Sequence, residues 1–314
     1  MTDSAPSRPA LTPAGTGAIL GVAAYVLWGV LPLYLKLLQH VPAGQVVAHR
    51  ILWSVLMLVV VVVLFGRVRT ILAAVTKRTL LMLTASAFLI AVNWLVYIWA
   101  VQNAHVLDAS LGYFINPLVN VALGVAVLGE RVRRIQWVAI ALAAAGVLVM
   151  ALSNGSSIWI SLVLALSFGT YGLIRKVVAI DALGGLLIET ILLAPFALGL
   201  LLVAHGGGEG AFGREMATDL LLVVAGAVTA APLLLFAGAA RRMPYAALGL
   251  LQYIAPTLQF LIAIFVFGEH LRPHDLAAFA LIWVGLAVYA SDSIRASRAA
   301  ARENLALEPA TRPI

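Results

Sequence analysis

The chain contains no cysteine and very few charged residues. Without cysteine it can form no disulfide bond, no thiolate nucleophile and no cysteine-ligated metal site. Charged residues make up 11% of its 314 residues, whereas soluble domains contain about 25%. Hydrophobic residues account for 63%, and the mean hydropathy is +1.05. This composition excludes a soluble domain and predicts an integral membrane protein.

The sequence also lacks the motifs of the common catalytic sites. It contains no G-x-x-x-x-G-K-[ST] phosphate-binding loop, no H-E-x-x-H zinc pair and no nucleophile elbow. Its few acidic residues are scattered near helix ends, so a mechanism with two paired carboxylates has little support. We therefore expect a protein that is not an enzyme and that uses no metal or cofactor.

What the sequence does contain is a series of apolar runs, each long enough to cross a bilayer, which takes about 20 residues. The alternating segments typical of a membrane β-barrel do not occur. We predict an all-α integral membrane protein with ten transmembrane helices, preceded by a disordered tail at 1–16 and followed by a basic tail at 293–314. The predicted helices cover about 17–37, 46–65, 80–101, 106–128, 134–152, 157–176, 184–204, 217–239, 245–267 and 274–292.

Lys and Arg are distributed unevenly between the two ends of these helices. Of the 20 Lys and Arg residues, only Lys36, Arg214 and Arg272 fall on the side opposite the N-terminus, and Arg50 lies just inside the second helix. Cytoplasmic loops of membrane proteins carry an excess of basic residues. The distribution therefore predicts that the N-terminus and the C-terminus are both cytoplasmic.

One segment of the chain occurs twice. Residues 112–130, GYFINPLVNVALGVAVLGE, return as residues 251–269, LQYIAPTLQFLIAIFVFGE. A shift of 139 positions superimposes Pro117 on Pro256, and matching Gly and Glu residues follow both prolines at the same spacing. Hydrophobic composition alone does not produce such a match, so the chain is interpreted as two copies of one unit.

The two copies are expected at 17–152 and 157–292, with five helices each. Because five is an odd number, the second copy must enter the membrane from the opposite side, and the repeats are inverted. Inverted repeats with proline-interrupted helices are typical of secondary transporters, whose solute binds between the repeats. Pro117 and Pro256 are candidates for helix kinks that free a backbone carbonyl at membrane depth, and the alternative is a kink needed only for packing.

Polar and aromatic side chains within the apolar helices are the candidate solute-binding residues. Tyr113 and Asn116 are three residues apart and therefore share one helix face. Such groups are costly in lipid and are expected to point into the bundle, either to line a cavity or to bond neighbouring helices. The full candidate set is Trp28, Asn93, Trp94, Tyr97, Tyr113, Asn116, Gln252, Tyr253 and Gln259.

Three ionisable residues are candidates for gating or proton coupling. His49 and Arg50 lie near the start of the second helix, and Glu189 lies at the equivalent place in the seventh. The inverted arrangement puts these positions near opposite mouths of the protein, where both His and Glu can titrate or pair. The alternative for Arg50 is that its side chain extends to the interface and has no role in transport.

The expected partners are a small-molecule solute and membrane lipid. The net charge of +7 does not predict nucleic-acid binding, because the basic residues sit in short loops without interleaved aromatic residues. The pattern Gly17-x-x-x-Gly21 and the small residues up to Gly146 permit close helix contacts. They are weak support for a homodimer.

The segment at residues 93–137 resembles the RarD branch of the EamA-type transporters, in the drug/metabolite transporter superfamily. AAYVLWG, HRILWS and FGTYGLIRK are also similar to this branch, so the resemblance covers about residues 17–292. It implies two inverted five-helix repeats in the bacterial inner membrane, with helices 1–4 and 6–9 around a central cavity and helices 5 and 10 outside it.

The sequence thus predicts a secondary transporter, with export of a small organic solute or drug-like metabolite as the expected direction. Solute would bind near the midplane between the repeats, which would expose it to each side in turn. Two other classes remain open. A passive channel or facilitator would contain a continuous wetted path, and a membrane receptor or scaffold would carry no flux.

Overall fold

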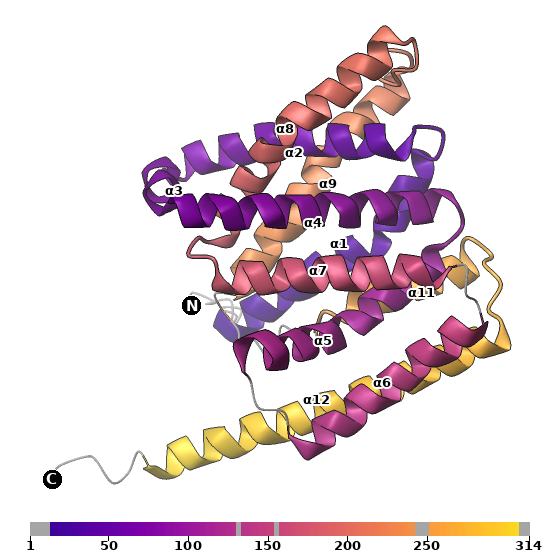
Figure 1. The fold of residues 1–314 in the computed structure, drawn as a ribbon. Coiled ribbons are helices and arrows are strands. Elements are labelled where there is room, and N and C mark those ends of the chain that lie inside the picture. Colours follow the sequence, from indigo (N-terminus) through magenta and orange to yellow (C-terminus); the bar gives the residue numbers. More distant parts are fainter. Residues whose placement is uncertain (1–12, 130–132, 154–156, 241, 243–250, 308–314) are drawn as a thin grey trace, which may run out of the picture.

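The computed structural model describes residues 13–129, 133–153, 157–240, 242 and 251–307, and every element in them is a helix (Figure 1). This confirms the predicted all-α class for the described residues. The helices are α1 (Pro13–Leu37), α2 (Ala43–Leu64), α3 (Val68–Ala74), α4 (Lys77–Gln102), α5 (Val106–Leu128), α6 (Arg134–Ser153), α7 (Ile158–Val177), α8 (Ala182–Gly206), α9 (Met216–Ala240), α11 (Ile254–Phe265) and α12 (Pro273–Leu307).

Eight of these helices, α1, α2, α4, α5, α7, α8, α9 and α12, are long and apolar enough to cross a membrane. Two more, α6 and α11, contain shorter apolar stretches. Large apolar side chains point outward from the bundle, and Leu152, Phe196 and Phe265 are each exposed over more than three quarters of their surface. Such a surface is stable in lipid and not in water, as expected for a multi-pass membrane protein.

The helices of the first half pack mainly against helices of the second half. α1 contacts α9 and α11, while α7 contacts α4 and α5. α2 lies against α8 and α9, at one edge of the bundle. α6 and α12 pack mostly on each other at the opposite edge (Figure 1).

Glycine permits two close approaches between α1 and α11 and between α5 and α7. A Cβ atom added to Gly29 would lie 2.7 Å from Leu258 Cδ1, and one added to Gly169 would lie 2.5 Å from Val119 Cγ1. Real Cβ atoms do not approach other atoms so closely. Each helix pair therefore depends on a glycine at its crossing point.

The contact between α6 and α12 is equally tight and involves the backbone. A Cβ atom at Gly146 would lie 2.8 Å from the carbonyl oxygen of Ala278, and one at Gly285 would lie 2.7 Å from that of Ala139. Gly146 is thus used inside the chain, and Gly17 and Gly21 are also buried. The glycines that offered weak support for a homodimer are accordingly buried within one chain, and the homodimer stays a prediction.

Helix boundaries differ from the predicted ones in several places. α1 begins at Pro13, so residues 13–16 of the predicted disordered tail are helical, while residues 1–12 lie outside the described part. The sequence did not predict α3, whose residue Ile71 is buried. α12 continues to Leu307 through the predicted tail, because Ala, Arg, Glu and Leu are strong helix formers. Of the predicted helix at 245–267, residues 245–250 lie outside the described part, a turn occupies 252–253, and α11 begins only at Ile254.

Candidate functional site

A buried arginine lies at the centre of the packed helices α2, α4 and α9. Arg50 is 6% exposed, and its guanidinium carbon lies 4.5 Å from the ring centroid of Trp94. Its Nε donates a 2.6 Å hydrogen bond to Thr229 Oγ1, while Nη1 is buried without a hydrogen-bond partner. The side chain therefore points into the bundle, so the alternative that it extends to the interface is wrong, while its role in transport stays a prediction.

Aromatic residues of α4 and α5 continue from Trp94. The ring of Tyr97 lies 5.5 Å from that of Tyr113, whose other side meets Phe168 of α7 at 6.0 Å. Tyr97 is 2% exposed, and its hydroxyl has no hydrogen-bond partner. These rings form an aromatic wall with an unused hydroxyl donor beside the Arg50 guanidinium.

Asn93 bonds three helices together at the far side of this wall. Its Nδ2 donates to the carbonyl oxygen of Leu164 at 3.1 Å and to Ser167 Oγ at 3.0 Å. Its Oδ1 accepts a hydrogen bond of 3.1 Å from the Tyr113 hydroxyl. Asn93 is fully satisfied by protein groups, which favours the helix-bonding role over direct contact with solute.

Asn116, on the neighbouring helix α5, makes no hydrogen bond through its side chain, in contrast to Asn93. It is 0% exposed, and neither its Nδ2 nor its Oδ1 has a hydrogen-bond partner. A buried amide without partners costs free energy, and such groups are rare in folded proteins. Asn116 therefore has unused donor and acceptor capacity inside the bundle, as a solute-contacting residue would.

Trp28 and Gln259 meet where α1 crosses α11. Gln259 Nε2 donates a 3.1 Å hydrogen bond to the carbonyl oxygen of Trp28, while its Oε1 is buried and unpartnered. The Trp28 ring packs against Tyr25 at 5.4 Å and Phe236 at 6.0 Å. The structure thus brings these two candidates together, with an aromatic cluster distinct from that of Trp94.

Glu189 lies in a second buried polar cluster, between α4, α7 and α8. It is 0% exposed and accepts a 2.6 Å hydrogen bond from Ser86 Oγ. Tyr171 donates a long hydrogen bond of 3.5 Å to its other oxygen, and Arg175 Nη1 lies 3.7 Å away. A carboxyl group held by hydroxyls and one arginine is well placed to exchange a proton or to lock helices together.

His49 belongs to neither cluster. Its ring stacks on Phe212 at 5.2 Å, in the loop between α8 and α9. Gln45, one turn earlier, holds the same loop through hydrogen bonds of 2.9 Å to Glu209 and to Ala211. The three gating candidates therefore occupy three separate environments.

The remaining candidates lie around α11. Pro256 is the third residue of this helix, where a missing N–H leaves no hydrogen bond broken; this differs from the mid-helix position that we expected. Its carbonyl oxygen accepts a 2.8 Å hydrogen bond from Ser110. Gln252 is half-buried in the preceding turn. Pro117 falls inside α5, but its side chain lies outside the described part.

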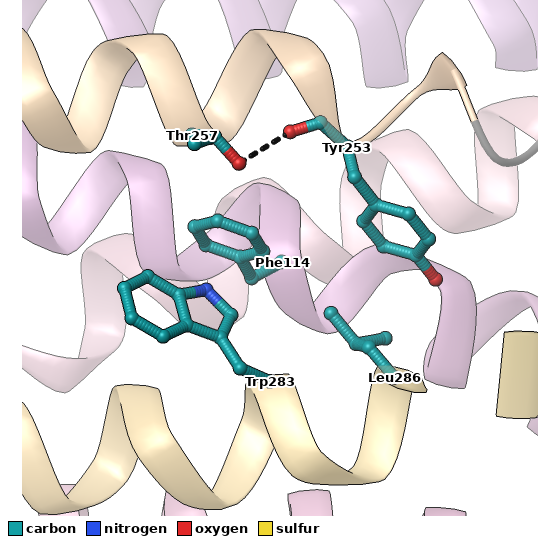
Figure 2. A pocket seen from close by; sticks show the side chains of 5 residues that line it. All are labelled: Phe114, Tyr253, Thr257, Trp283 and Leu286. Atoms are coloured by element: carbon teal, nitrogen blue, oxygen red, sulfur yellow. Dashed lines mark hydrogen bonds between the residues drawn. The ribbon is translucent and has the colours of Figure 1, made fainter. Parts of the chain in front are cut away.

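Tyr253 lines an open pocket of about 360 Å³ between α5, α11 and α12 (Figure 2). Figure 2 shows the ring of Phe114 above Trp283 and the ring of Tyr253 above Leu286, with Thr257 bonded to the Tyr253 carbonyl oxygen. The pocket is lined almost entirely by apolar atoms, its remaining residue being Leu286. No lining residue belongs to the Arg50 or Glu189 clusters.

Sequence reasoning missed the hydroxyl residues that hold the two buried charges, namely Thr229 for Arg50 and Ser86 for Glu189. A lone Ser or Thr within an apolar helix was the available signal, but most such residues bond only their own backbone. Among the described residues, no group of three His, Cys, Asp or Glu side chains is arranged to hold a metal ion.

The EamA-like transporter family matches residues 15–152. An uncharacterized transporter of Pseudomonas aeruginosa is 50% identical over 287 residues, which are 90% of this chain and 95% of the relative. Protein RarD of Escherichia coli K12 is 46% identical, with coverage of 90% and 96%.

A more distant relative, the chloramphenicol-sensitive protein RarD of Pseudomonas aeruginosa, is 35% identical and covers 93% of this chain and 99% of its own length. One solved crystal structure superimposes with a TM-score of 0.59 at 20% identity. It covers 87% of this chain and 96% of the compared one. At this identity the likeness concerns the fold alone.

Proposed function

The chain belongs to the RarD branch of the EamA-like transporters, in the drug/metabolite transporter superfamily, and from this premise we propose that it is a secondary transporter that exports a small organic solute. Membership of this family and the eight long apolar helices make it a multi-pass membrane transporter. We also propose alternating access as the mechanism and a cytoplasmic location for both termini. α1 starts and α12 ends on the same side of the bundle (Figure 1), in agreement with that orientation.

Pairs of equivalent contacts support two inverted five-helix repeats. Gly29 of the first half contacts Leu258 of the second, and Gly169 of the second half contacts Val119 of the first. The two glycines are 140 positions apart in the sequence, and Val119 and Leu258 are 139 apart. The packing of α1 on α9 likewise corresponds to that of α7 on α4. A two-fold relation between the halves accounts for all of these pairs.

The contacts of α6 and α12 obey the same relation. Gly146 and Ala278 exchange with Gly285 and Ala139 under a shift of 139. In addition, Gly129 after α5 and Gly268 after α11 both adopt left-handed backbone conformations, with φ of 66° and 68°. Glycine favours this conformation because it has no Cβ atom.

The observation that carries the proposal is the placement of the two buried charges. Arg50 and Glu189 each lie seven positions after the first residue of their helices, Ala43 of α2 and Ala182 of α8. With a rise of 1.5 Å per residue, this is about 10 Å into the helix. In an inverted pair, one charge is near the outer side and the other is near the cytoplasmic side.

Arg50 and Glu189 thus place opposite charges at equivalent depths, one near each membrane face. This placement is suited to a transporter whose site opens to the two sides in turn. We assign Arg50 and Glu189, with His49 at the outer loop, to gating or coupling, and the unsatisfied amides of Asn116 and Gln259 to the solute path. Trp28, Trp94, Tyr97 and Tyr113 form its aromatic walls, and Asn93 fixes the last of these rings. Gln252 and Tyr253 are assigned to the path at the α11 end.

Transport is tested by counterflow in proteoliposomes, with labelled amino acids, organic acids, nucleobases, amines and drugs, with and without a pH gradient. If the protein is a transporter, vesicles that are preloaded with unlabelled solute should accumulate the labelled solute. Downhill flux without counterflow would favour a channel, and absence of flux for every solute would favour a receptor or scaffold.

The solute path is tested by Asn116→Leu, which should abolish counterflow while leaving the protein folded, since Asn116 makes no hydrogen bond that would be lost. Asn103→Leu is the matched control, because Asn103 is an exposed amide at the end of α4 that bonds the carbonyl oxygen of Trp99 one turn earlier. Unchanged counterflow in Asn116→Leu would remove this residue from the path.

A further inference from the structure

Arg50 has no acidic partner among the residues that the structure describes. The buried acids are Asp108, Glu189 and Asp275. Asp108 bonds to His105 at 2.9 Å, Asp275 lies 3.3 Å from Arg272, and Glu189 belongs to the separate Ser86 cluster. The ionisable side chains nearest to Arg50 are instead those of three tyrosines, Tyr34, Tyr97 and Tyr113.

A buried cation in this state is costly. Removing a charged group from water costs several kcal/mol unless an opposite charge compensates for it. Thr229 Oγ1 and the face of Trp94 compensate only partly. Tyr34 is occupied, since its hydroxyl bonds to the carbonyl oxygen of Leu221 at 2.7 Å. Packing alone gives no reason to keep a guanidinium here.

The unused donors of this cluster are the specific feature. A guanidinium carries five N–H donors in a planar fork, and Nη1 of Arg50 has no acceptor. The hydroxyl of Tyr97, which lies near Arg50, is also unpartnered and buried. The guanidinium lies over the ring of Trp94, and the ring of Tyr97 meets that of Tyr113 edge to face. A positive fork and a hydroxyl next to flat apolar rings match a carboxylate attached to an apolar or aromatic body.

We propose that Arg50 binds the carboxylate of the transported solute, and that this solute is a small organic acid with a single negative charge whose apolar body lies against Trp94, Tyr97 and Tyr113. This inference rests on the proposed transport function. It assigns Arg50 to cargo binding, in addition to gating. The carboxylate reaches the guanidinium when the two halves move apart at this cluster during the transport cycle.

The single positive charge of Arg50 favours some classes of solute over others. One cation and one carboxylate cancel, whereas a phosphate dianion would leave one negative charge buried. An ammonium group would find no carboxylate beside Arg50 in the described part of the chain. Organic monoacids are therefore favoured over phosphate esters and over amines.

The test is direct binding to the full-length protein in lipid nanodiscs, by calorimetry and by the shift of the thermal unfolding midpoint. The probes are a series of monocarboxylates from acetate through phenylacetate to indole-3-acetate, with phenylacetamide, phenyl phosphate and phenethylamine as neutral, dianionic and cationic counterparts. At least one aromatic monocarboxylate should bind, and phenylacetamide should bind ten- to a hundredfold more weakly, because a charge-assisted hydrogen bond is lost.

The variants are Arg50→Gln, Arg50→Lys and the control Arg78→Gln, which removes one charge from an exposed position at the start of α4. Arg50→Gln should lose carboxylate binding ten- to a hundredfold, Arg50→Lys should retain part of it, and Arg78→Gln should bind normally. Without ligand, Arg50→Gln should unfold at the same temperature as the unchanged protein or at a higher one, because it removes an uncompensated buried charge.

Three results would overturn the inference: no monocarboxylate binds, phenylacetamide or phenyl phosphate binds as tightly as phenylacetate, or Arg50→Gln binds carboxylates unchanged. Its failure is separable from failure of the proposed function. Counterflow of neutral or cationic solutes without carboxylate binding would reject the inference alone. Carboxylate binding that depends on Arg50, without flux of any solute, would reject transport and leave the binding site in place.

Discussion

Ser86 Oγ donates a 2.6 Å hydrogen bond to Glu189 Oε1, and both side chains are fully buried. This bond joins α4 of the first half to α8 of the second. Ser86→Ala should lower the free energy of unfolding by about 1–3 kcal/mol, because it leaves a buried carboxyl oxygen with fewer partners. Thermal unfolding in detergent measures the change.

Thr84→Ala is the matched control for this variant. Thr84 is an exposed hydroxyl residue on the same helix that bonds only its own backbone, at Leu80. Its replacement should change the free energy of unfolding by less than about 0.5 kcal/mol. Equal effects of the two variants would show that the bond to Glu189 contributes nothing particular.

Gly146→Ala and Gly285→Ala should each destabilise the protein by about 1–3 kcal/mol, because the new methyl group meets a backbone carbonyl that cannot turn aside. Gly199→Ala in α8 has no atom within 4 Å of the new methyl and should stabilise by about 0.5–1 kcal/mol, through helix propensity alone. Thermal unfolding of the three variants gives the comparison, and a stabilising Gly285→Ala would contradict the close backbone contact.

Glu269 predicts a pH dependence of stability. Its carboxylate accepts hydrogen bonds of 2.8 and 2.9 Å from the N–H groups of Val106 and Leu107 at the start of α5. Burial raises the pKa of this carboxyl above its ordinary value of 4.5, and the two hydrogen bonds lower it by less. The folded state then holds its proton more tightly than the unfolded state, so the free energy of unfolding falls as pH rises from 4.5 through the folded-state pKa.

Unfolding of purified protein across this pH range measures the effect. Glu269→Gln should flatten the dependence, since the side chain no longer titrates. Glu209→Gln, at an exposed position in the loop before α9, should leave the dependence unchanged. A pH profile that is identical in Glu269→Gln and the unchanged protein would rule out this carboxyl as its source.

Asp181 combines two roles that substitution can separate. Its Oδ1 caps α8 by accepting a 2.8 Å hydrogen bond from Gly184, and its Oδ2 pairs with Arg67, just before α3. Asp181→Asn keeps the cap and loses the ion pair, which is partly exposed and worth at most about 1 kcal/mol. Asp181→Ala loses both and should cost about 1–2 kcal/mol more. If thermal unfolding shows equal losses, the cap contributes little.

Much of the fold was predictable because the bilayer restricts the choices. Apolar runs of membrane-spanning length gave all-helical structure and nearly every helix position. Short helices outside that pattern were not predictable. α3 is held by the burial of Ile71 near Gly184 and by the pairing of Arg67 with Asp181, contacts between segments far apart in the sequence.

Part of the grouping of the candidate residues was predictable, while their role in binding solute stays a prediction. Asn93, Trp94, Tyr97 and Tyr113 do lie together, as spacing along α4 and α5 indicates. The sequence could not indicate that Arg50 turns inward over Trp94, because a side chain so near a helix start can equally extend to the interface. Its direction depends on tertiary contacts with Trp94 and Thr229, as the separation of His49 depends on the packing of Phe212.

The glycine contact between α6 and α12 has a mechanical consequence. Two backbones in direct contact leave no flexible side chains to absorb sliding, so this line is a stiff junction between the halves. The contacts of Gly112 with Ser161 and of Gly226 with Trp53 also bring a glycine against the backbone of the other half. Any relative movement of the halves must therefore pivot about such contacts or repack them. The edge of the bundle farthest from α6 and α12 is formed by α2 and α8 (Figure 1), the helices that carry Arg50 and Glu189.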